Sequence, residues 1–272
     1  MEHGQEHSAL DAAGIAAYWA AQAEQHGLDP ASSWSDVRAI ELEIASISRY
    51  VEAGMDVLDA GCATGYSTVR FARADGVHVL GVDYTEQMIA LARERQAATP
   101  GEIAARLEFR VGDVRTLVDI PETSFDIVVT TRVLINLGTS AEQAAAIHSL
   151  GRRVRPGGLL LLSEATIEGW QRLNALRREW GLSDIGMPSF NLYLEESAVA
   201  TAAGADFVLE GIENFASTYL VATRVLKPLL ARSAVHEVDV GDPNAEFNRW
   251  ASLLPTAGDF GAQKLFVLRR RA

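Results

Sequence analysis

The residues best suited to binding a ligand lie in a glycine-bracketed turn that follows a short apolar run: Asp59, Gly61, Cys62 and Gly65. The run at 57–60 predicts a buried strand, and the residues after the turn predict a helix. Such a turn lets a ligand lie against bare backbone at the carboxyl end of a parallel strand. A dinucleotide fingerprint would place glycine at positions 61, 63 and 66, but this chain has Ala63 and Tyr66. The turn therefore disfavours a nicotinamide oxidoreductase and favours a ligand without a pyrophosphate.

Further polar side chains follow the next predicted strands. Asp83 lies 22 residues after Gly61, close to the offset of a ribose-binding acid, and its carboxylate could accept both ribose hydroxyls. Asp113 follows the strand predicted at 107–111 and is placed to accept from an adenine amino group. The strand predicted at 125–130 runs into a loop at the same edge. A structural alternative remains for each acid, because an aspartate after a strand often caps the next helix.

Strand and helix patterns alternate through the chain. Strands are predicted at 55–60, 77–82, 107–111, 125–130, 159–163, 207–215 and 265–268. Helices are predicted between them, with Thr85 and Thr139 as N-caps. This alternation predicts an α/β protein with a doubly wound, mostly parallel seven-stranded sheet, and helical N-terminal and inserted cap elements. Right-handed crossovers place the carboxyl ends of the parallel strands, and hence the ligand crevice, at one edge.

Composition excludes several classes of function. The 272 residues carry a net charge of −12, so a nucleic-acid partner would meet an unfavourable field. The single cysteine excludes an intrachain disulfide and a cysteine-based metal cage. Residues 1–10 contain no apolar run and no aliphatic run spans a bilayer, so we expect a cytoplasmic protein without a secretory signal or membrane partner. The oligomeric state stays open, with a homodimer as one option.

Five motifs together resemble those of class I S-adenosylmethionine-dependent methyltransferases. They are VLDAGCATGYST (57–68), VLGVDYTEQMI (79–89), VGDV (111–114), FDIVVTTRVLINL (125–137) and RVRPGGLLLLSE (153–164). The resemblance covers about residues 50–165 and implies the Rossmann-like methyltransferase fold with S-adenosyl-L-methionine as cofactor and no metal. The segment TRVLINL lacks the Asn/Asp-Pro-Pro-Tyr/Phe signature of enzymes that methylate amino groups of nucleic acids, which favours a small-molecule substrate.

The resemblance assigns these residues to the cofactor: Asp59, Gly61, Cys62, Gly65, Asp83, Tyr84, Met88, Asp113, Val114, Thr131 and Arg132. In the family the glycine turn lies under the methionine part, the acid after the second strand holds the ribose and the acid after the third meets adenine. Tyr84 and Met88 would then flank the adenine ring, with the Thr131 backbone and the Arg132 side chain near the methionine end. Ala63 departs from the family, in which many members have a second glycine.

Methyl transfer is an in-line displacement in which the protein mainly supplies alignment, and a base is needed only if the acceptor must lose a proton. Glu164, at the end of the fifth predicted strand, and His148, in the helix predicted at 141–154, are the candidates for catalysis. His236 is a further candidate in a loop. The structural alternatives are a helix-capping acid and ordinary surface histidines.

The substrate would meet the region after the fifth strand. Trp170, Asn174 and Arg177 share one helical face, and Asn191 and Tyr193 follow in a loop. An amide and a guanidinium among aromatics suit an organic substrate with polar groups, anionic ones included; docking of this helix on the core is the alternative. Aromatic residues of the N-terminal region either form a lid over the cofactor or pack as core: Tyr18, Trp19 and Trp34.

We therefore expect four regions. They are an N-terminal helical lid (1–50), an S-adenosylmethionine-binding core (51–165), a helical cap for the substrate (166–206) and the last core strands with a helical insert (207–272). The predicted function is methyl transfer to O, N or C of a small organic molecule, in keeping with the biosynthesis of a secondary metabolite. The alternative is a non-catalytic S-adenosylmethionine-binding interaction module.

Overall fold

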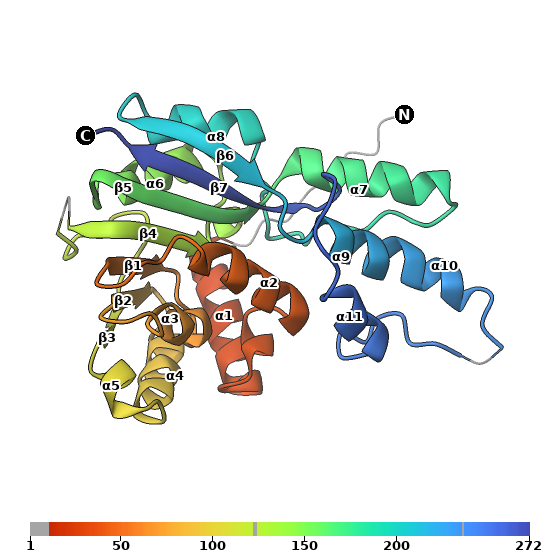
Figure 1. Cartoon of the computed structure of the whole chain (residues 1–272), viewed down its shortest axis with the longest axis horizontal. Helices are drawn as coiled ribbons and strands as arrows, with labels where there is room; N and C mark the ends of the chain where they lie inside the picture. Colours follow the sequence, from red (N-terminus) through yellow and green to blue (C-terminus); the bar gives the residue numbers. More distant parts are fainter. Residues whose placement is uncertain (1–10, 122–123, 236) are drawn as a thin grey trace.

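A seven-stranded sheet organises the structure, a computed structural model that describes residues 11–121, 124–235 and 237–272 (Figure 1). The strand order is β3-β2-β1-β4-β5-β7-β6. The strands are β1 (Asp56–Ala60), β2 (His78–Asp83), β3 (Leu107–Val111), β4 (Phe125–Thr131), β5 (Val154–Ala165), β6 (Phe207–Glu213) and β7 (Gln263–Arg270). Only β7 runs antiparallel to its neighbours β5 and β6. The predicted doubly wound, mostly parallel sheet is confirmed.

The fifth strand is longer than predicted. The sequence predicts this strand at 159–163, but β5 begins at Val154 and includes Pro156, Gly157 and Gly158, where the register against β4 shifts between Phe125 and Ile127. A bulge absorbs the residues that neither pair regularly nor carry an apolar side chain. The periodicity of the flanking leucines therefore marked only the regular part of the strand.

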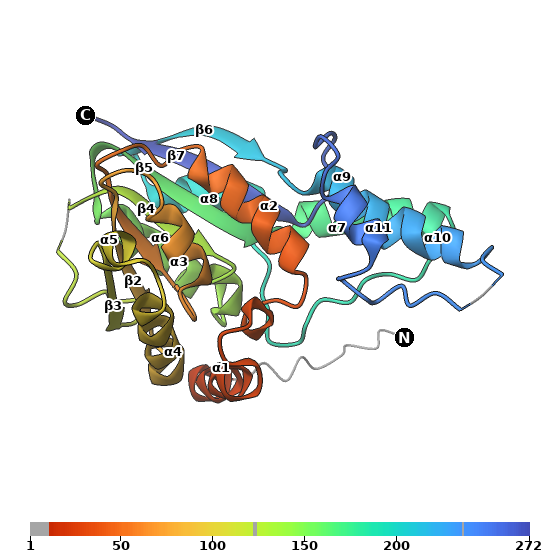
Figure 2. The same cartoon turned by 60° about the horizontal axis from the view of Figure 1, so that its bottom comes forward.

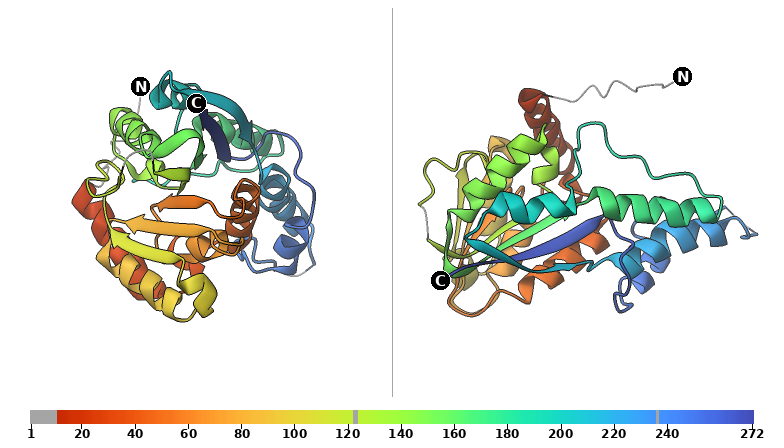
Figure 3. Two further views of the ribbon diagram at one scale, coloured as in Figure 1. Left: turned by 60° about the vertical axis from the view of Figure 1, so that its left-hand side comes forward. Right: turned by 90° about the horizontal axis from the view of Figure 1, so that it is seen from above.

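Both faces of the sheet are buried, which explains the uninterrupted leucine run of β5. Leu159 and Leu161 belong to one core cluster, and Leu160 and Leu162 to the other. Helices cover both faces in Figure 3. The first cluster includes residues of α2 (Val37–Ser48), α3 (Tyr66–Phe71) and α4 (Glu86–Ala97), and the second includes residues of α6 (Ser140–Gly151) and α8 (Glu196–Ala203). A short helix, α5 (Gly101–Ala104), precedes β3.

The first helix lies beside the carboxyl edge of the sheet. It is α1 (Ala12–His26), followed by the 3-10 turn η1 (Pro30–Ser32). Asp11 caps it by accepting from the N–H of Gly14 at 2.8 Å. Helix α1 packs against α4 and η1, and Figure 2 shows it below the sheet next to α4. The expected helical N-terminal region is therefore two helices joined by a short turn.

A helical arm extends from the same edge of the sheet, beyond the carboxyl ends of β5 and β6 (Figure 1). It consists of α7 (Ile167–Glu179), α9 (Ser217–Val221), the π-helical turn Ala222–Leu226, α10 (Lys227–Ala231) and α11 (Glu246–Ala251). Leu173, Leu182 and Val225 form a small core between α7 and the π-helical turn. No helix within the described ranges is both long and apolar enough to cross a membrane.

Buried polar contacts join the arm to α2. Asp36 caps α2 by accepting from the N–H of Ala39 at 3.2 Å. The same carboxylate accepts from the hydroxyl of Tyr219 and from Nη2 of Arg224, each at 2.6 Å. The Tyr219 hydroxyl also accepts from Nδ2 of Asn248 at 3.2 Å. The arm therefore fixes the start of α2, which packs on the sheet.

We expect Tyr219→Phe to lower the free energy of unfolding by about 1–3 kcal/mol, because it leaves a buried amide donor without its acceptor. Tyr50→Phe is the matched control, since the Tyr50 hydroxyl bonds Glu213 on a half-buried surface. The control should cost about 0.5 kcal/mol. Urea unfolding of both variants measures the difference, and equal costs would contradict a special role for the buried contact.

Candidate functional site

One large cavity opens at the carboxyl edge of the sheet, with a volume of about 730 Å³. Its walls come from the ends of β1, β2 and β4, the residues after β3, the helix α1, η1 and the loop 188–193. It spans the neighbouring strands β1 and β4, where the strand order reverses, as expected for a ligand site in such a sheet. The volume suits a cofactor together with a second small molecule. Among the described residues, no three His, Cys, Asp or Glu side chains gather as a metal site.

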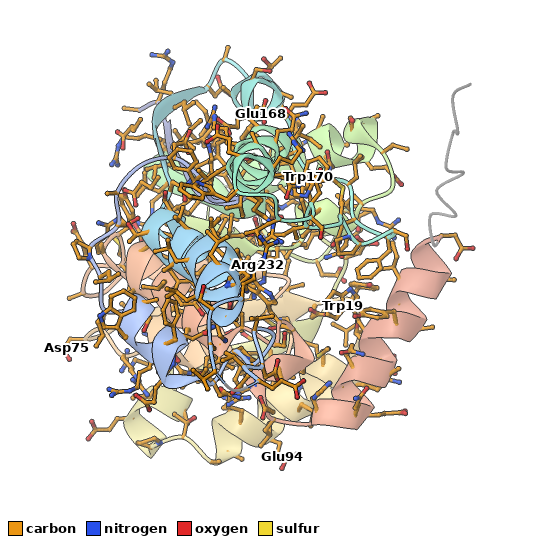
Figure 4. The ribbon with its side chains drawn as sticks, turned by 90° about the vertical axis from the view of Figure 1, so that its right-hand side faces the viewer. Trp19, Asp75, Glu94, Glu168, Trp170 and Arg232 are labelled. Atoms are coloured by element: carbon orange, nitrogen blue, oxygen red, sulfur yellow. The ribbon has the colours of Figure 1, made fainter. Side chains whose placement is uncertain are left out.

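Aromatic rings close the cavity from the side of α1. Tyr18, Trp19 and Trp34 all line it. Figure 4 shows Trp19 projecting from α1 toward the body of the protein. The Tyr18 ring lies 4.8 Å from the ring of Phe190 in the loop 188–193. The N-terminal helix and the loop before α8 thus meet over the ligand space.

Backbone conformation fixes the glycine turn. Gly61 has φ +86°, and a Cβ there would lie 2.1 Å from Cγ2 of Val133. Gly65 has φ +72°, and its Cβ would lie 2.8 Å from Cζ of Phe109. Ala63 also has a left-handed φ of +45°, so this residue carries strain that a glycine would not. Gly61, but not Gly65, lines the cavity; Gly65 serves close packing of the turn on β3.

Asp83 is held in the cavity wall by two backbone donors. Oδ1 accepts from the N–H of Thr85 at 2.9 Å, and Oδ2 accepts from the N–H of Ala63 at 3.0 Å. Burial raises the pKa of Asp83, while these hydrogen bonds lower it. Thr85 is the N-cap residue of α4 as predicted, but its side chain makes no cap hydrogen bond, whereas the Thr139 hydroxyl accepts from the N–H of Glu142. Each oxygen of Asp83 keeps a lone pair for a ligand hydroxyl.

Asp59 lies behind the turn and does not line the cavity. Its Oδ2 accepts from the Thr68 hydroxyl at 2.6 Å, and its Oδ1 has no hydrogen-bond partner among the described residues. Burial raises the pKa of Asp59 to about 7, although the Thr68 hydroxyl lowers it. The structure therefore places this acid as a support between β1 and α3, and not beside the cavity as the family resemblance implied.

The other residues predicted for the cofactor do line the cavity: Cys62, Tyr84, Met88, Asp113, Val114, Thr131 and Arg132. Asp113 differs from expectation because Arg115 occupies its carboxylate, with Nη2 at 2.5 Å and Nε at 2.9 Å from Oδ2. Burial alone would raise the pKa of Asp113, but the hydrogen bonds and charge of Arg115 hold it below its ordinary value. An adenine amino group would therefore share this acceptor with a guanidinium.

A buried polar cluster underlies the end of β4. Arg132 has φ +58°, and its N–H donates to the carbonyl of Ser163 at 2.8 Å. Its Nη1 pairs with Oε2 of Glu43 on α2. Oε1 of Glu43 accepts from the Ser163 hydroxyl at 2.6 Å and from Nε2 of Gln263 at 3.1 Å. Burial lowers the pKa of Arg132 to about 10, although the nearby charge of Glu164 raises it.

Sequence reasoning missed Glu43 and Gln263. Glu43 lies three residues after Ile40 and one before Ile44, on the apolar stripe that packs α2 on the sheet. A charged residue on such a stripe is the signal that was available, because a buried carboxylate needs a partner. Gln263 gave no signal, since its role depends on β7 lying beside β5.

The candidates for catalysis lie outside the cavity. Glu164 is fully buried and does not line it; the carboxylate accepts from the Thr130 hydroxyl at 2.8 Å and from the N–H groups of residues 133–135. Burial raises the pKa of Glu164 to about 7, although these donors lower it. His148 is exposed on α6 and also absent from the cavity wall. His236 lies outside the described residues. Glu164 is thus placed to position the loop after β4, and neither it nor His148 reaches an acceptor.

The predicted substrate residues divide into two groups. Asn191 and Tyr193 line the cavity. Trp170, Asn174 and Arg177 share one face of α7, as predicted, but hold the following loop: Trp170 Nε1 donates to the carbonyl of Ile185 at 2.8 Å, and Arg177 Nε to that of Ser183 at 2.8 Å. Asn174 bonds both backbone groups of Ile185. Figure 4 shows Trp170 on α7, in the arm and apart from Trp19. These three residues dock the arm, which was the structural alternative.

Comparison with known proteins finds similarity to methyltransferases in the part of the chain that carries the sequence motifs. Residues 57–158 match a family model described as a methyltransferase domain. A malonyl-[acyl-carrier protein] O-methyltransferase of Serratia marcescens is 32% identical over 152 residues, which cover 56% of this chain and 53% of that enzyme. The chain thus spans about half the length of the curated relative it matches.

Solved structures share the fold over more of the chain. Magnesium protoporphyrin IX methyltransferase from Synechocystis, with bound S-adenosylhomocysteine, has a TM-score of 0.56 at 17% identity and covers 93% of each chain. The [4+2]-cyclase SpnF has a TM-score of 0.56 at 19% identity, over 84% of this chain and 80% of that one. Because the fold carries more than one reaction, the site has to identify the chemistry.

We expect the raised pKa of Asp59 to make stability fall with rising pH. The folded state binds this proton up to about pH 7, whereas the unfolded chain releases it near pH 4, so the contribution is full below pH 4 and lost by pH 7. Asp59→Asn removes the titration. Relative to wild type, the variant should gain about 2–3 kcal/mol of unfolding free energy between pH 5 and pH 8.

Urea unfolding at each pH measures this gain, and Asp75→Asn at an exposed aspartate is the matched control. The control should track wild type at every pH. A constant offset between Asp59→Asn and wild type would show that Asp59 ionises normally in the folded protein.

Proposed function

We propose that this chain, whose residues 57–158 belong to the class I S-adenosylmethionine-dependent methyltransferases, transfers a methyl group to O, N or C of a small organic molecule. The observation that carries the proposal is the Asp83 carboxylate in the cavity wall, tied through the N–H of Ala63 to the turn that begins at Gly61. This contact holds a hydroxyl acceptor and a bare-backbone turn beside each other, the pair that a ribose linked to an amino-acid chain requires.

Different residues of this chain would bind the ribose, the adenine and the methionine part of the cofactor. Asp83 would accept from the ribose hydroxyls, Tyr84 and Met88 would flank the adenine, and Gly61 would let the methionine part lie on the backbone. S-adenosylmethionine, when bound, supplies an electrophilic methyl group on a positively charged sulfur. Rings from α1 and the loop 188–193 would exclude water from the transfer, and the backbone would align the acceptor, which is the main demand of an in-line displacement.

A small acceptor is favoured over a nucleic acid by the net charge of −12 and by the aromatic cover of the cavity. One relative is named as a malonyl-[acyl-carrier protein] O-methyltransferase, so an acceptor attached to a carrier protein is the second option for the substrate. A role in biosynthesis, a cytoplasmic location and a homodimer stay predictions from the sequence.

We expect Asp83→Asn to weaken binding of S-adenosylhomocysteine by about tenfold to a hundredfold, because the ribose hydroxyls lose a charged acceptor worth about 1–3 kcal/mol. Titration calorimetry measures the affinity, and a thermal scan verifies that the variant is folded. Asp75→Asn, outside the cavity, should bind like wild type. An unchanged affinity in Asp83→Asn would show that Asp83 only links the two turns.

The reaction itself is tested with methyl-labelled S-adenosylmethionine, a metabolite extract and mass spectrometry. We expect a small molecule that gains one labelled methyl group in proportion to the amount of protein added. If S-adenosylmethionine binds but no extract yields a labelled product, the non-catalytic binding module becomes the better account. If NADH binds and S-adenosylmethionine does not, the proposed class of cofactor is wrong.

A further inference from the structure

The cavity has a second half that the proposed cofactor does not need. The residues assigned to the ribose and the adenine come from the end of β2 and the residues after β3, and the glycine turn follows β1, all on one side of the reversal in strand order. Thr131 and Arg132, which the family resemblance placed near the methionine end, lie across that reversal at the end of β4. On the other side, the wall comes from the ends of β4 and β5, from the start of β7, and from the loops after β4 and before α8. We call this wall the acceptor half; its residues include Arg132, Asn136, Ala165, Asn191, Tyr193 and Gln263.

Arg132 supplies a cation to the acceptor half. Nη1 is paired with Glu43, whereas Nε and Nη2 donate no hydrogen bond within the described residues. Neither nitrogen is among the buried polar atoms that lack a partner, so both keep some accessible surface, and Arg132 lines the cavity. The side chain is 13% exposed, against 0% for Glu43. One edge of the guanidinium is therefore anchored, and the other is available to a ligand.

The anchor holds the guanidinium in place. Glu43 is fixed by donors from β5 and β7, so it cannot move with its partner. The ring of Trp34 lies 5.1 Å from Cζ of Arg132. A planar guanidinium fixed at one edge and flanked by a ring is pre-organised to hold a planar acid group through two parallel hydrogen bonds.

The charged residues around Arg132 favour a ligand with a single negative charge in the acceptor half. Four acidic residues line the cavity, Asp11, Asp83, Asp113 and Glu142, and none comes from the strand ends of the acceptor half. Glu164 lies close enough to raise the pKa of Arg132, but backbone donors occupy its carboxylate. A single guanidinium already shared with Glu43 suits a monovalent carboxylate better than a divalent phosphate.

We propose that the methyl acceptor is a carboxylic acid whose carboxylate is bound by Nε and Nη2 of Arg132. The proposal rests on the proposed function, because it assigns the acceptor of that reaction. Aromatic residues of the cavity wall, Trp34 beside the guanidinium and Tyr193 from the loop before α8, favour an acceptor whose remaining surface is apolar. A carboxylate could also come from the amino-acid end of the cofactor, and the experiment separates these two sources.

The informative variant removes both charges of the buried pair. Arg132→Gln with Glu43→Gln avoids an unpaired buried carboxylate, and the two amides are able to bond each other. Arg132→Lys keeps the positive charge but cannot donate two parallel hydrogen bonds to one carboxylate. Arg110→Gln with Glu108→Gln is the matched control, because it deletes an exposed ion pair on β3 outside the cavity.

Calorimetry with two cofactor fragments tests the source of the carboxylate. S-adenosylhomocysteine carries the amino-acid carboxylate, whereas 5′-methylthioadenosine lacks it. We expect the double variant Arg132→Gln/Glu43→Gln to bind both within about threefold of wild type. A loss of tenfold or more for S-adenosylhomocysteine alone would assign Arg132 to the cofactor and overturn the proposal.

Labelling of a fractionated extract tests the acceptor. A metabolite extract is divided on an anion-exchange resin at pH 7, and each fraction is incubated with labelled S-adenosylmethionine. We expect wild type and the matched control to label a compound from the anionic fraction, and the double variant to label it at least about tenfold more slowly. The Arg132→Lys variant should fall between them, mainly through a raised KM.

The outcomes of the labelling are distinct. A labelled acceptor that comes only from the non-anionic fraction would overturn the proposal and leave the proposed function intact. An anionic acceptor that the double variant labels at the wild-type rate would also overturn it. Labelling of neither fraction would instead contradict the proposed function, and this inference would fall with it.

Discussion

The structure depends on the reversal of strand order between β1 and β4. Successive strands are added outward from β1 through β2 to β3 on one side of the sheet, and from β4 to β5 on the other. Because neighbouring crossovers diverge here, the crossover helices leave the carboxyl ends of β1 and β4 open, and a cavity forms between these strand ends and α1. Every group that we assign to binding stands at the end of one of these strands or on a segment that folds over them.

Asp83 and Arg132 are the opposed poles of this cavity. Asp83 is a buried acid that two N–H groups hold in place on the β2 side. Arg132 is a partly paired base on the β4 side, with its partner Glu43 reaching in from α2. The Asp83 carboxylate can accept hydrogen bonds from ligand hydroxyls, and the Arg132 guanidinium can donate hydrogen bonds to an anion. The two halves of the cavity therefore differ in chemistry as well as in position. Transfer of a methyl group between the two halves requires this separation of donor and acceptor sites.

The sequence was sufficient for the sheet and for placing Gly61, Asp83 and Asp113 at its carboxyl edge, because these predictions depend on local patterns. The glycine turn, Asp83 and Asp113 are read from strand ends, and parallel topology brings strand ends together. The acceptor side depends on contacts distant in sequence. Glu43 meets Gln263, which is 220 residues away, and no periodicity in either segment predicts that contact.

For helix α7, the sequence predicted which side chains share a face but not what that face contacts. Trp170, Asn174 and Arg177 do share a face, as spacing predicted, but that face turns to the loop at 183–185 and not to the cavity. Spacing determines which side chains lie together and leaves open what they face. Glu164 was likewise expected at the cavity because it ends a strand, yet alternation along β5 turns its side chain toward the loop after β4.

The most direct test of the division of the cavity into a cofactor side and the acceptor half is a crystal structure with S-adenosylhomocysteine. The account predicts the ribose hydroxyls on Asp83 and the homocysteine chain along Gly61, with Nε and Nη2 of Arg132 still open toward the space over β5 and β7. A ribose bound elsewhere, or the homocysteine carboxylate on Arg132, would contradict it.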